Sequence, residues 1–151
     1  MSKGQYRVAL AVLAVAGLLG GGCVPIGVLP SEQVEVSISN AGTARQLGSG
    51  FMASQPSPGN LYWYCQVTVK NVGKGKHHAN PNNIMIETAE GFTYSYSPVT
   101  HLDVARGFPG VDVQPGSSAT GMIVFEIPVQ SPPTRLIYEP MFGTPVKVPL
   151  R

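Results

Sequence analysis

Three groups of side chains in this sequence have the chemical types that catalysis or metal binding requires. His77 and His78 are adjacent imidazoles, His101 lies two residues before Asp103, and Cys65 carries a thiol. Adjacent residues of an extended chain point to opposite faces. No cysteine or carboxylate lies close enough in sequence to the adjacent imidazoles to complete a metal site. We therefore interpret His77 and His78 as residues of a solvated turn.

The other two groups do not match a known catalytic arrangement. A triad that used His101 and Asp103 would also need a nucleophile and oxyanion donors, and no Gly-x-Ser-x-Gly segment provides them. A reactive thiol needs a lowered pKa and access to solvent, whereas Cys65 alternates with Trp63 and Val67 in a pattern that favours burial. The sequence thus predicts a protein that is not an enzyme and that uses no metal or cofactor. A small extracellular hydrolase using His101 and Asp103 is an alternative.

Four tyrosines are the candidate binding residues. Tyr62 and Tyr64 lie on the polar side of the strand expected over residues 61–70, and Tyr94 and Tyr96 share one side of a second expected strand with Phe92. Exposed tyrosines provide rigid contact area with a polar group, as binding surfaces do. Tyrosine also simply suits strands. We take the four tyrosines as a possible binding surface, with the loop over residues 40–60 beside the first pair.

The segment over residues 61–70 is the strand around which the other elements are arranged. Its apolar residues recur at every second position, with polar or tyrosine side chains between them. A period of two over ten residues predicts a half-exposed strand with one buried face. The residues expected to face the core are Leu61, Trp63, Cys65, Val67 and Val69.

Shorter alternating segments separated by turn residues predict the rest of the fold. Glu90-Gly91 is expected to make a tight reversal, Pro115-Gly116 a type II turn, and residues 98–106 one short helical turn. The fold class expected is all-β, an immunoglobulin-like antiparallel β-sandwich of seven or eight strands over residues 33–151. The further strands are expected at residues 33–39, 82–88, 92–96, 111–113, 119–127, 135–139 and 146–150.

The charge of the chain argues against nucleic-acid binding. The 151 residues include 10 basic and 8 acidic side chains. Lys3 and Arg7 precede the apolar N-terminal segment, so the rest of the chain carries eight basic and eight acidic residues. A neutral domain lacks the basic surface that nucleic acids require. The length fits one domain.

Residues 1–22 have the order of a secretory signal segment. Lys3 and Arg7 are followed by the uncharged run Val8 to Leu19 and by Gly20-Gly21-Gly22-Cys23. Small residues before a cysteine resemble the lipobox of bacterial and archaeal lipoproteins, although Gly20 stands where that motif usually has leucine. The resemblance implies that Cys23 receives diacylglycerol and becomes the new N-terminus.

This N-terminal segment predicts an extracytoplasmic domain attached to the membrane through lipid on Cys23, with residues 23–32 as a tether. Ordinary cleavage to a secreted protein and a single-pass N-terminal anchor are the alternatives. Cys65 is unpaired if Cys23 carries lipid; otherwise a disulfide between the two cysteines is conceivable in an oxidising compartment.

Three further segments together resemble a known group of domains. They are Val67 to Gly73, Gln114-Pro115-Gly116 and Gly121 to Pro128. With the lipobox-like segment, they resemble the secreted or lipid-anchored immunoglobulin-like domains of unknown function of bacteria and archaea, over about residues 60–150. The resemblance implies a β-sandwich at the cell surface without catalytic residues.

We therefore predict a cell-envelope lipoprotein whose domain binds a protein or another envelope component, or has a structural role. The alternative is an accessory subunit that docks onto a larger envelope complex through a sheet edge.

Overall fold

The computed structural model describes residues 33–50, 53–101 and 106–150. Within these ranges the chain forms nine strands, one more than the upper number expected, and two short 3-10 helices. The additional strand is β3, in a segment whose two histidines were expected to lie in a turn. The strands are β1 (Val34–Ala44), β2 (Asn60–Asn71), β3 (His77–Ala79), β4 (Ile84–Thr88), β5 (Thr93–Ser95), β6 (Val111–Val113), β7 (Ser118–Pro128), β8 (Pro133–Tyr138) and β9 (Val146–Pro149), and the helices are η2 (Pro81–Asn83) and η3 (Pro98–His101).

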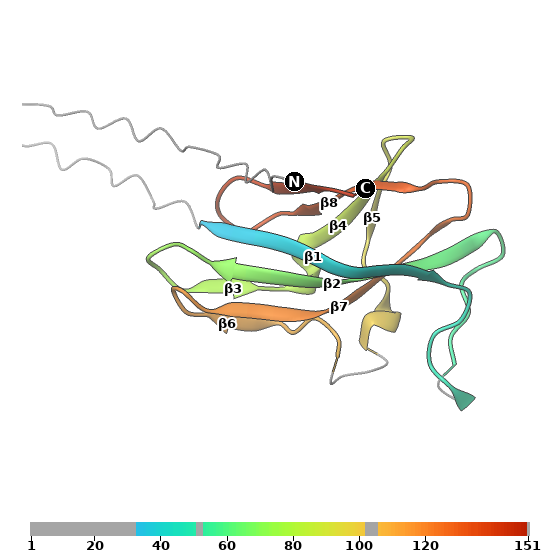
Figure 1. The fold of residues 1–151 in the computed structure, drawn as a ribbon, viewed down its shortest axis with the longest axis horizontal. Helices are drawn as coiled ribbons and strands as arrows, with labels where there is room; N and C mark the ends of the chain where they lie inside the picture. The colour runs from blue at the N-terminus through green and yellow to red at the C-terminus, as the bar shows by residue number, and fades with distance from the viewer. Residues whose placement is uncertain (1–32, 51–52, 102–105, 151) are drawn as a thin grey trace, which may run out of the picture.

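The strands form two facing layers (Figure 1). One layer contains the sheet β1-β2-β7, and the other contains the sheet β5-β4-β8-β9. A two-stranded sheet, β3-β6, completes the fold. All pairs of named strands are antiparallel, and the predicted immunoglobulin-like β-sandwich is confirmed.

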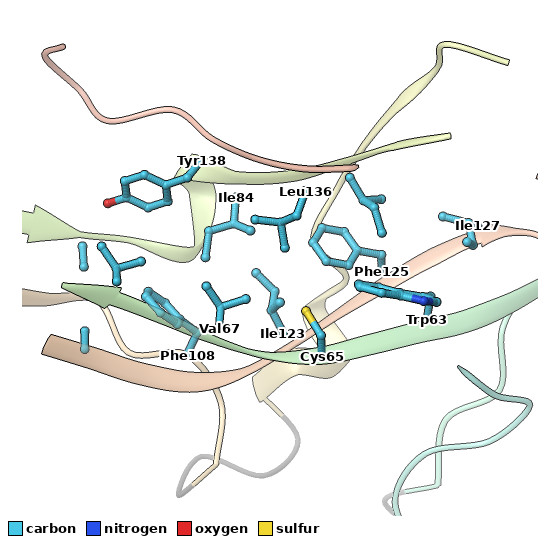
Figure 2. Packing of buried hydrophobic residues seen from close by; sticks show 14 of the residues in the cluster. Trp63, Cys65, Val67, Ile84, Phe108, Ile123, Phe125, Ile127, Leu136 and Tyr138 are labelled. Atoms are coloured by element: carbon cyan, nitrogen blue, oxygen red, sulfur yellow. The ribbon is translucent and has the colours of Figure 1, made fainter. Parts of the chain in front are cut away.

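β2 is the central strand of its sheet, as its alternation predicts. It pairs with β1 on one side and with β7 on the other, and Trp63 lies opposite Phe125. The two rings contact each other with their centroids 6.0 Å apart. Figure 2 shows Trp63, Cys65 and Val67 between the layers, with Val67 below Ile84 and Trp63 beside Phe125. The predicted core face of β2 is confirmed for its four buried members, Trp63, Cys65, Val67 and Val69.

The predicted turns form for the reasons that their residues suggested. Gly116 has a φ of 81°, and the Ser117 N–H donates to the Gln114 carbonyl over 3.0 Å. This is the geometry of a type II turn. Gly91 has a φ of 85°, and its N–H donates to the Thr88 carbonyl over 2.9 Å. These two glycines allow β6 to reverse into β7 and β4 into β5.

Asn71 joins the end of β2 to its neighbours through its side chain. This buried amide donates to the carbonyls of Gly75 (2.7 Å) and Val113 (2.9 Å), and its oxygen accepts from the Gly73 N–H (2.9 Å). Side-chain hydrogen bonds of this kind are the reason that asparagine is common in turns. The amides of Val72 and Gly73 also donate to the carbonyl of Gln33. The chain therefore enters the sandwich beside this turn, at one end of β2.

A segment before β6 extends the sheet on the free side of β7. Gly107 forms a parallel bridge with Met122, the Phe108 N–H donates to the Met122 carbonyl (2.8 Å), and the Met122 N–H donates to the Arg106 carbonyl (2.6 Å). A Cβ at Gly121 would lie 2.3 Å from the Cα of Phe108. The segment can lie this close, and bury Phe108, because residue 121 is glycine.

Candidate functional site

The structure corrects the predicted exposure of Tyr62. This side chain is 2% exposed, and its hydroxyl lies 2.9 Å from Ser54 Oγ. Tyr62 points away from the core face of β2, as the alternation requires, but a loop of the chain covers it. The expectation of an exposed Tyr62 is wrong because alternation assigns a residue to a face of a strand without revealing what covers that face.

The covering loop, which the structure describes over residues 45–50 and 53–59, is held by Glu126 of β7. The Glu126 carboxylate accepts from the Ser57 N–H (2.8 Å) and from Asn60 Nδ2 (2.9 Å). These hydrogen bonds, chiefly the one from Asn60, lower the pKa of Glu126. Within the loop, Leu47 and Ser54 exchange backbone hydrogen bonds of 3.0 and 2.7 Å. The loop is therefore folded onto the outer face of the sheet at the start of β2.

Tyr64 is the partly exposed tyrosine of β2. It lies opposite Gly42 of β1, where a β-bulge shifts the register between Ser39 and Gly42. A Cβ at Gly42 would lie 2.6 Å from the Tyr64 hydroxyl, so the phenol ring lies across this glycine. Asn40, within the bulge, has a φ of 51°, a conformation that asparagine tolerates better than most residues. Bulges are common next to binding sites because they redirect side chains.

Beyond Tyr64 along β2, the same outer face contains a hollow of about 290 Å³. The Gln66 side-chain oxygen accepts from Asn40 Nδ2 (2.9 Å) and from Ser39 Oγ (3.3 Å). We call this feature the outer-face hollow. Its lining residues are Asn40, Gln66, Arg106, Thr120, Gly121 and Met122.

The lining of the outer-face hollow is suited to a polar partner. Amides, a hydroxyl and a guanidinium can form hydrogen bonds, and among the described residues no carboxylate, imidazole or thiol lines the hollow. Asn40 belongs to the segment over residues 40–60 that was expected beside Tyr62 and Tyr64, whereas the other lining residues were not predicted. Gln66 was detectable as a polar residue on the exposed side of β2, and Arg106 comes from a distant segment that only the fold brings to it.

The structure also separates the second pair of tyrosines from the first. Tyr94 and Tyr96 belong to the other layer, where they are partly buried against the hydrophobic core. Phe92, predicted to share their side, is 63% exposed because it lies in the hairpin before β5. The four tyrosines therefore do not form one exposed surface, and Tyr64 is the one that lies beside the outer-face hollow.

Of the candidate catalytic residues, Cys65 has an environment that disfavours catalysis. His101 is exposed and contacts Tyr96 edge-on, with ring centroids 5.5 Å apart. Asp103 lies outside the described residues. Cys65 is fully buried without a disulfide partner in the described ranges, and burial raises the pKa of its thiol to about 12. A thiol that stays protonated in the core is not a nucleophile.

The interpretation of the two histidines as a solvated turn is wrong for His77. β3 pairs with β6, and its residues alternate between buried and exposed. His77 is buried and hydrogen-bonds to the Tyr138 hydroxyl. His78 points to solvent, and its Nδ1 lies 2.8 Å from Asp112 Oδ1. A strand of three residues is too short to reveal its period in the sequence. In the described part of the chain, no three His, Cys, Asp or Glu side chains gather as metal ligands.

Cys23, the predicted signal segment (residues 1–22) and the predicted tether (residues 23–32) lie outside the described residues. Across the ranges that the structure describes, no helix has the length and apolar character needed to cross a bilayer.

A family model matches residues 30–147, which include almost the whole sandwich. Its description is "domain of unknown function (DUF4352)". The chain belongs to the DUF4352 family. The resemblance to bacterial immunoglobulin-like domains of unknown function is thereby confirmed. A search of curated proteins finds no match.

Solved structures share the fold of this DUF4352 domain. The ycdA protein of Bacillus subtilis, provisionally described as a lipoprotein, has a TM-score of 0.63 at 18% identity over 80% of this chain. The chain spans 37% of that protein. The secreted protein MPT63 of Mycobacterium tuberculosis has a TM-score of 0.55 at 18% identity, with 78% of this chain and 82% of that chain covered. The yjhA protein of Bacillus subtilis has a TM-score of 0.59 at 13% identity, with 80% and 94% covered. These TM-scores show a common fold, and at identities this low the similarity shows nothing further.

Proposed function

We propose that this protein is a cell-envelope lipoprotein, anchored by lipid on Cys23, whose DUF4352 sandwich serves as an extracytoplasmic binding or structural module. The observation that carries the proposal is the division of the chain at Cys23. An uncharged apolar run ends just before this cysteine, and the family domain begins at residue 30. Two fold relatives, one described provisionally as a lipoprotein and one as secreted, support an extracytoplasmic location.

The anchor is tested by expression in a bacterial host followed by detergent phase partitioning. We expect the wild-type protein to enter the detergent phase, because two or more acyl chains give stable attachment. The Cys23→Ser variant removes the thiol that accepts the lipid, so its sandwich should be released to the aqueous phase or stay as an uncleaved precursor. Wild-type and Cys23→Ser proteins that partition and migrate identically would contradict the anchor.

The binding role is supported by the outer-face hollow and Tyr64. A partly exposed tyrosine beside several hydrogen-bond donors is the combination found at protein interfaces. We expect Tyr64→Ala and Gln66→Ala to lose a partner that is crosslinked to the wild-type protein in intact envelopes. Phe92→Ala, which changes an exposed aromatic residue away from the hollow, is the matched control. Equal crosslinking of all three variants would exclude this face as the binding surface.

The second candidate function is an accessory subunit that docks through a sheet edge. The observation that favours it is the position of β1, an edge strand of eleven residues in the sheet β1-β2-β7. Such an edge can accept a strand from a partner. A protein that is monomeric and free of partners in mild-detergent extracts would contradict this candidate.

A further inference from the structure

The loop between β8 and β9 exposes two large apolar side chains at one end of the sandwich. Met141 is 76% exposed and Phe142 is 62% exposed. They are the only two neighbours in sequence among the exposed large apolar residues of the described ranges, and contiguous exposed apolar surface marks protein or membrane contacts. The two residues line a hollow of about 300 Å³ whose remaining lining residues are Lys76, His78, Asn80, Asn83 and Asp112.

This end of the molecule is also the end at which the chain enters the sandwich. β1 begins at Val34, opposite Asn71. The turn that follows Asn71 leads directly to Lys76 and His78, which line the hollow with Met141 and Phe142. In Figure 1 the start of β1, the β2–β3 turn and the β8–β9 loop lie at the same end of the sandwich. We call this the tether end.

The short segment outside the described residues limits how far the tether end can lie from the anchor. Ten residues, 23–32, separate Cys23 from the domain, and ten residues span at most about 35 Å. β2 has twelve residues, so the sandwich is about 40 Å long in the strand direction. A lipid on Cys23 therefore holds the tether end at a higher effective concentration at the bilayer surface than the opposite end.

We propose that the Met141–Phe142 loop is a membrane-contact site that inserts into the lipid interface; this inference rests on the anchor proposed above. The partner of this site is a phospholipid bilayer. The aromatic ring of Phe142 and the flexible side chain of Met141 insert at the boundary between its headgroups and acyl chains.

The charged groups beside the loop fit a position at the water side of this interface. Asp112 accepts from Lys76 Nζ over 2.8 Å, and the same carboxylate lies 2.8 Å from His78 Nδ1. All three side chains are about half exposed. Lys76 and Asp112 pair with each other, and the β8–β9 loop itself carries one charged residue, Glu139. No basic residue lies in this loop, so apolar insertion is the main source of contact.

The opposite end of the sandwich supplies a matched control. Phe92, in the hairpin between β4 and β5, is 63% exposed, almost the same as Phe142. β4 runs from Ile84, which pairs with Tyr138, to Thr88, which pairs with Pro133. This direction takes the chain away from the β8–β9 loop. Phe92 is therefore an equally exposed ring that the anchor does not hold near lipid.

The experiment uses the full lipidated protein in phosphatidylcholine vesicles with and without brominated acyl chains, which quench tryptophan at close range. The variants are Phe142→Trp and Phe92→Trp, and the wild type gives the background of the buried Trp63. We expect brominated lipid to remove most of the emission that Phe142→Trp adds and to leave the emission that Phe92→Trp adds unchanged.

Intact mass separates the two ways in which this experiment can fail. Protein that carries the acyl-glyceryl mass on Cys23 but shows equal quenching, or none, in both variants overturns the membrane-contact site alone. Protein without that mass overturns the anchor and the contact site together. Selective quenching of Phe142→Trp in acylated protein supports both.

Discussion

Replacing Gly121 with alanine tests the closest approach found at any glycine of the described residues. An added Cβ would lie 2.3 Å from the Cα of Phe108, 2.6 Å from its nitrogen and 2.7 Å from the carbonyl oxygen of Gly107. Carbon atoms pack best at about 3.5–4.0 Å. All three neighbours are backbone atoms, so no side-chain rotation can relieve the clash, and the segment over residues 106–108 must move away from β7.

The expected cost follows from what this movement breaks. Two backbone hydrogen bonds join Met122 to residues 106 and 108, and each contributes about 1 kcal/mol. Phe108 is 1% exposed, and complete loss of a buried phenylalanine costs about 3–5 kcal/mol. Partial withdrawal of Phe108 together with both hydrogen bonds gives a loss of about 3 kcal/mol. For a domain of this size the Tm should fall by roughly 10–15 °C.

The assay is urea unfolding followed by the emission of the buried Trp63, with the Tm measured separately. Gly110→Ala is the matched control, because a Cβ there meets no atom within 4 Å. We expect Gly110→Ala to stay within about 0.5 kcal/mol of the wild type, as most surface substitutions do. A Gly121→Ala protein as stable as Gly110→Ala would refute the close packing of residues 106–108 on β7.

Three further predictions concern the loop over residues 45–59 and the core. Tyr62→Ala should lower the free energy of unfolding by about 3–5 kcal/mol, because it empties a buried aromatic position. Tyr64→Ala should lower it by less than half as much, because Tyr64 is partly exposed. Equal losses of the two variants in chemical denaturation would contradict the burial of Tyr62. Hydrogen bonds from Asn60 and Ser57 lower the pKa of Glu126 in the folded protein. The stabilisation that these bonds give the loop should therefore be complete above the ordinary glutamate pKa of about 4.3. It should be lost as the pH falls through the lower pKa of the folded state. Hydrogen exchange of the Ser57 amide, corrected for its intrinsic rate, should therefore accelerate at acid pH in the wild type and show no such change in Glu126→Gln; an unchanged wild-type rate would count against this attachment. Because burial raises the pKa of Cys65 to about 12, iodoacetamide should leave this thiol unmodified in the native protein and alkylate it in urea, and rapid native alkylation would show an accessible thiolate instead.

The sequence was sufficient to predict the parts of the fold that depend on local patterns. The alternation of β2 identified which of its residues face the core, and Pro115-Gly116 identified a type II turn that the structure contains. Strand alternation and turn residues act over a few neighbouring positions, so they can be interpreted without knowledge of the rest of the chain.

The errors arose where distant segments meet. Tyr62 is on the predicted face, but Ser54 and the loop around it cover that face. His77 is buried through its contact with Tyr138, 61 positions away in sequence. Tyr94 and Tyr96 alternate as expected, yet their shared side faces the core. A period of two groups residues on one side of a strand, and tertiary packing decides which side is buried.

The candidate site was predictable only in part for the same reason. Tyr64 and Gln66 lie on a face of β2 that its alternation predicts to be polar. The outer-face hollow also needs Asn40, which the bulge in β1 turns toward Gln66, and Arg106, from the segment beside β7. Neither residue has a local sequence signal that connects it to this strand.

The measurement that tests the central claim most directly is the intact mass of the protein purified from bacterial membranes. We expect a chain that has lost residues 1–22 and begins at Cys23 with an acyl-glyceryl group attached. A membrane-bound chain with the mass of the complete, unmodified sequence, or a soluble chain cleaved elsewhere without added lipid, would contradict the account of a lipid-anchored β-sandwich.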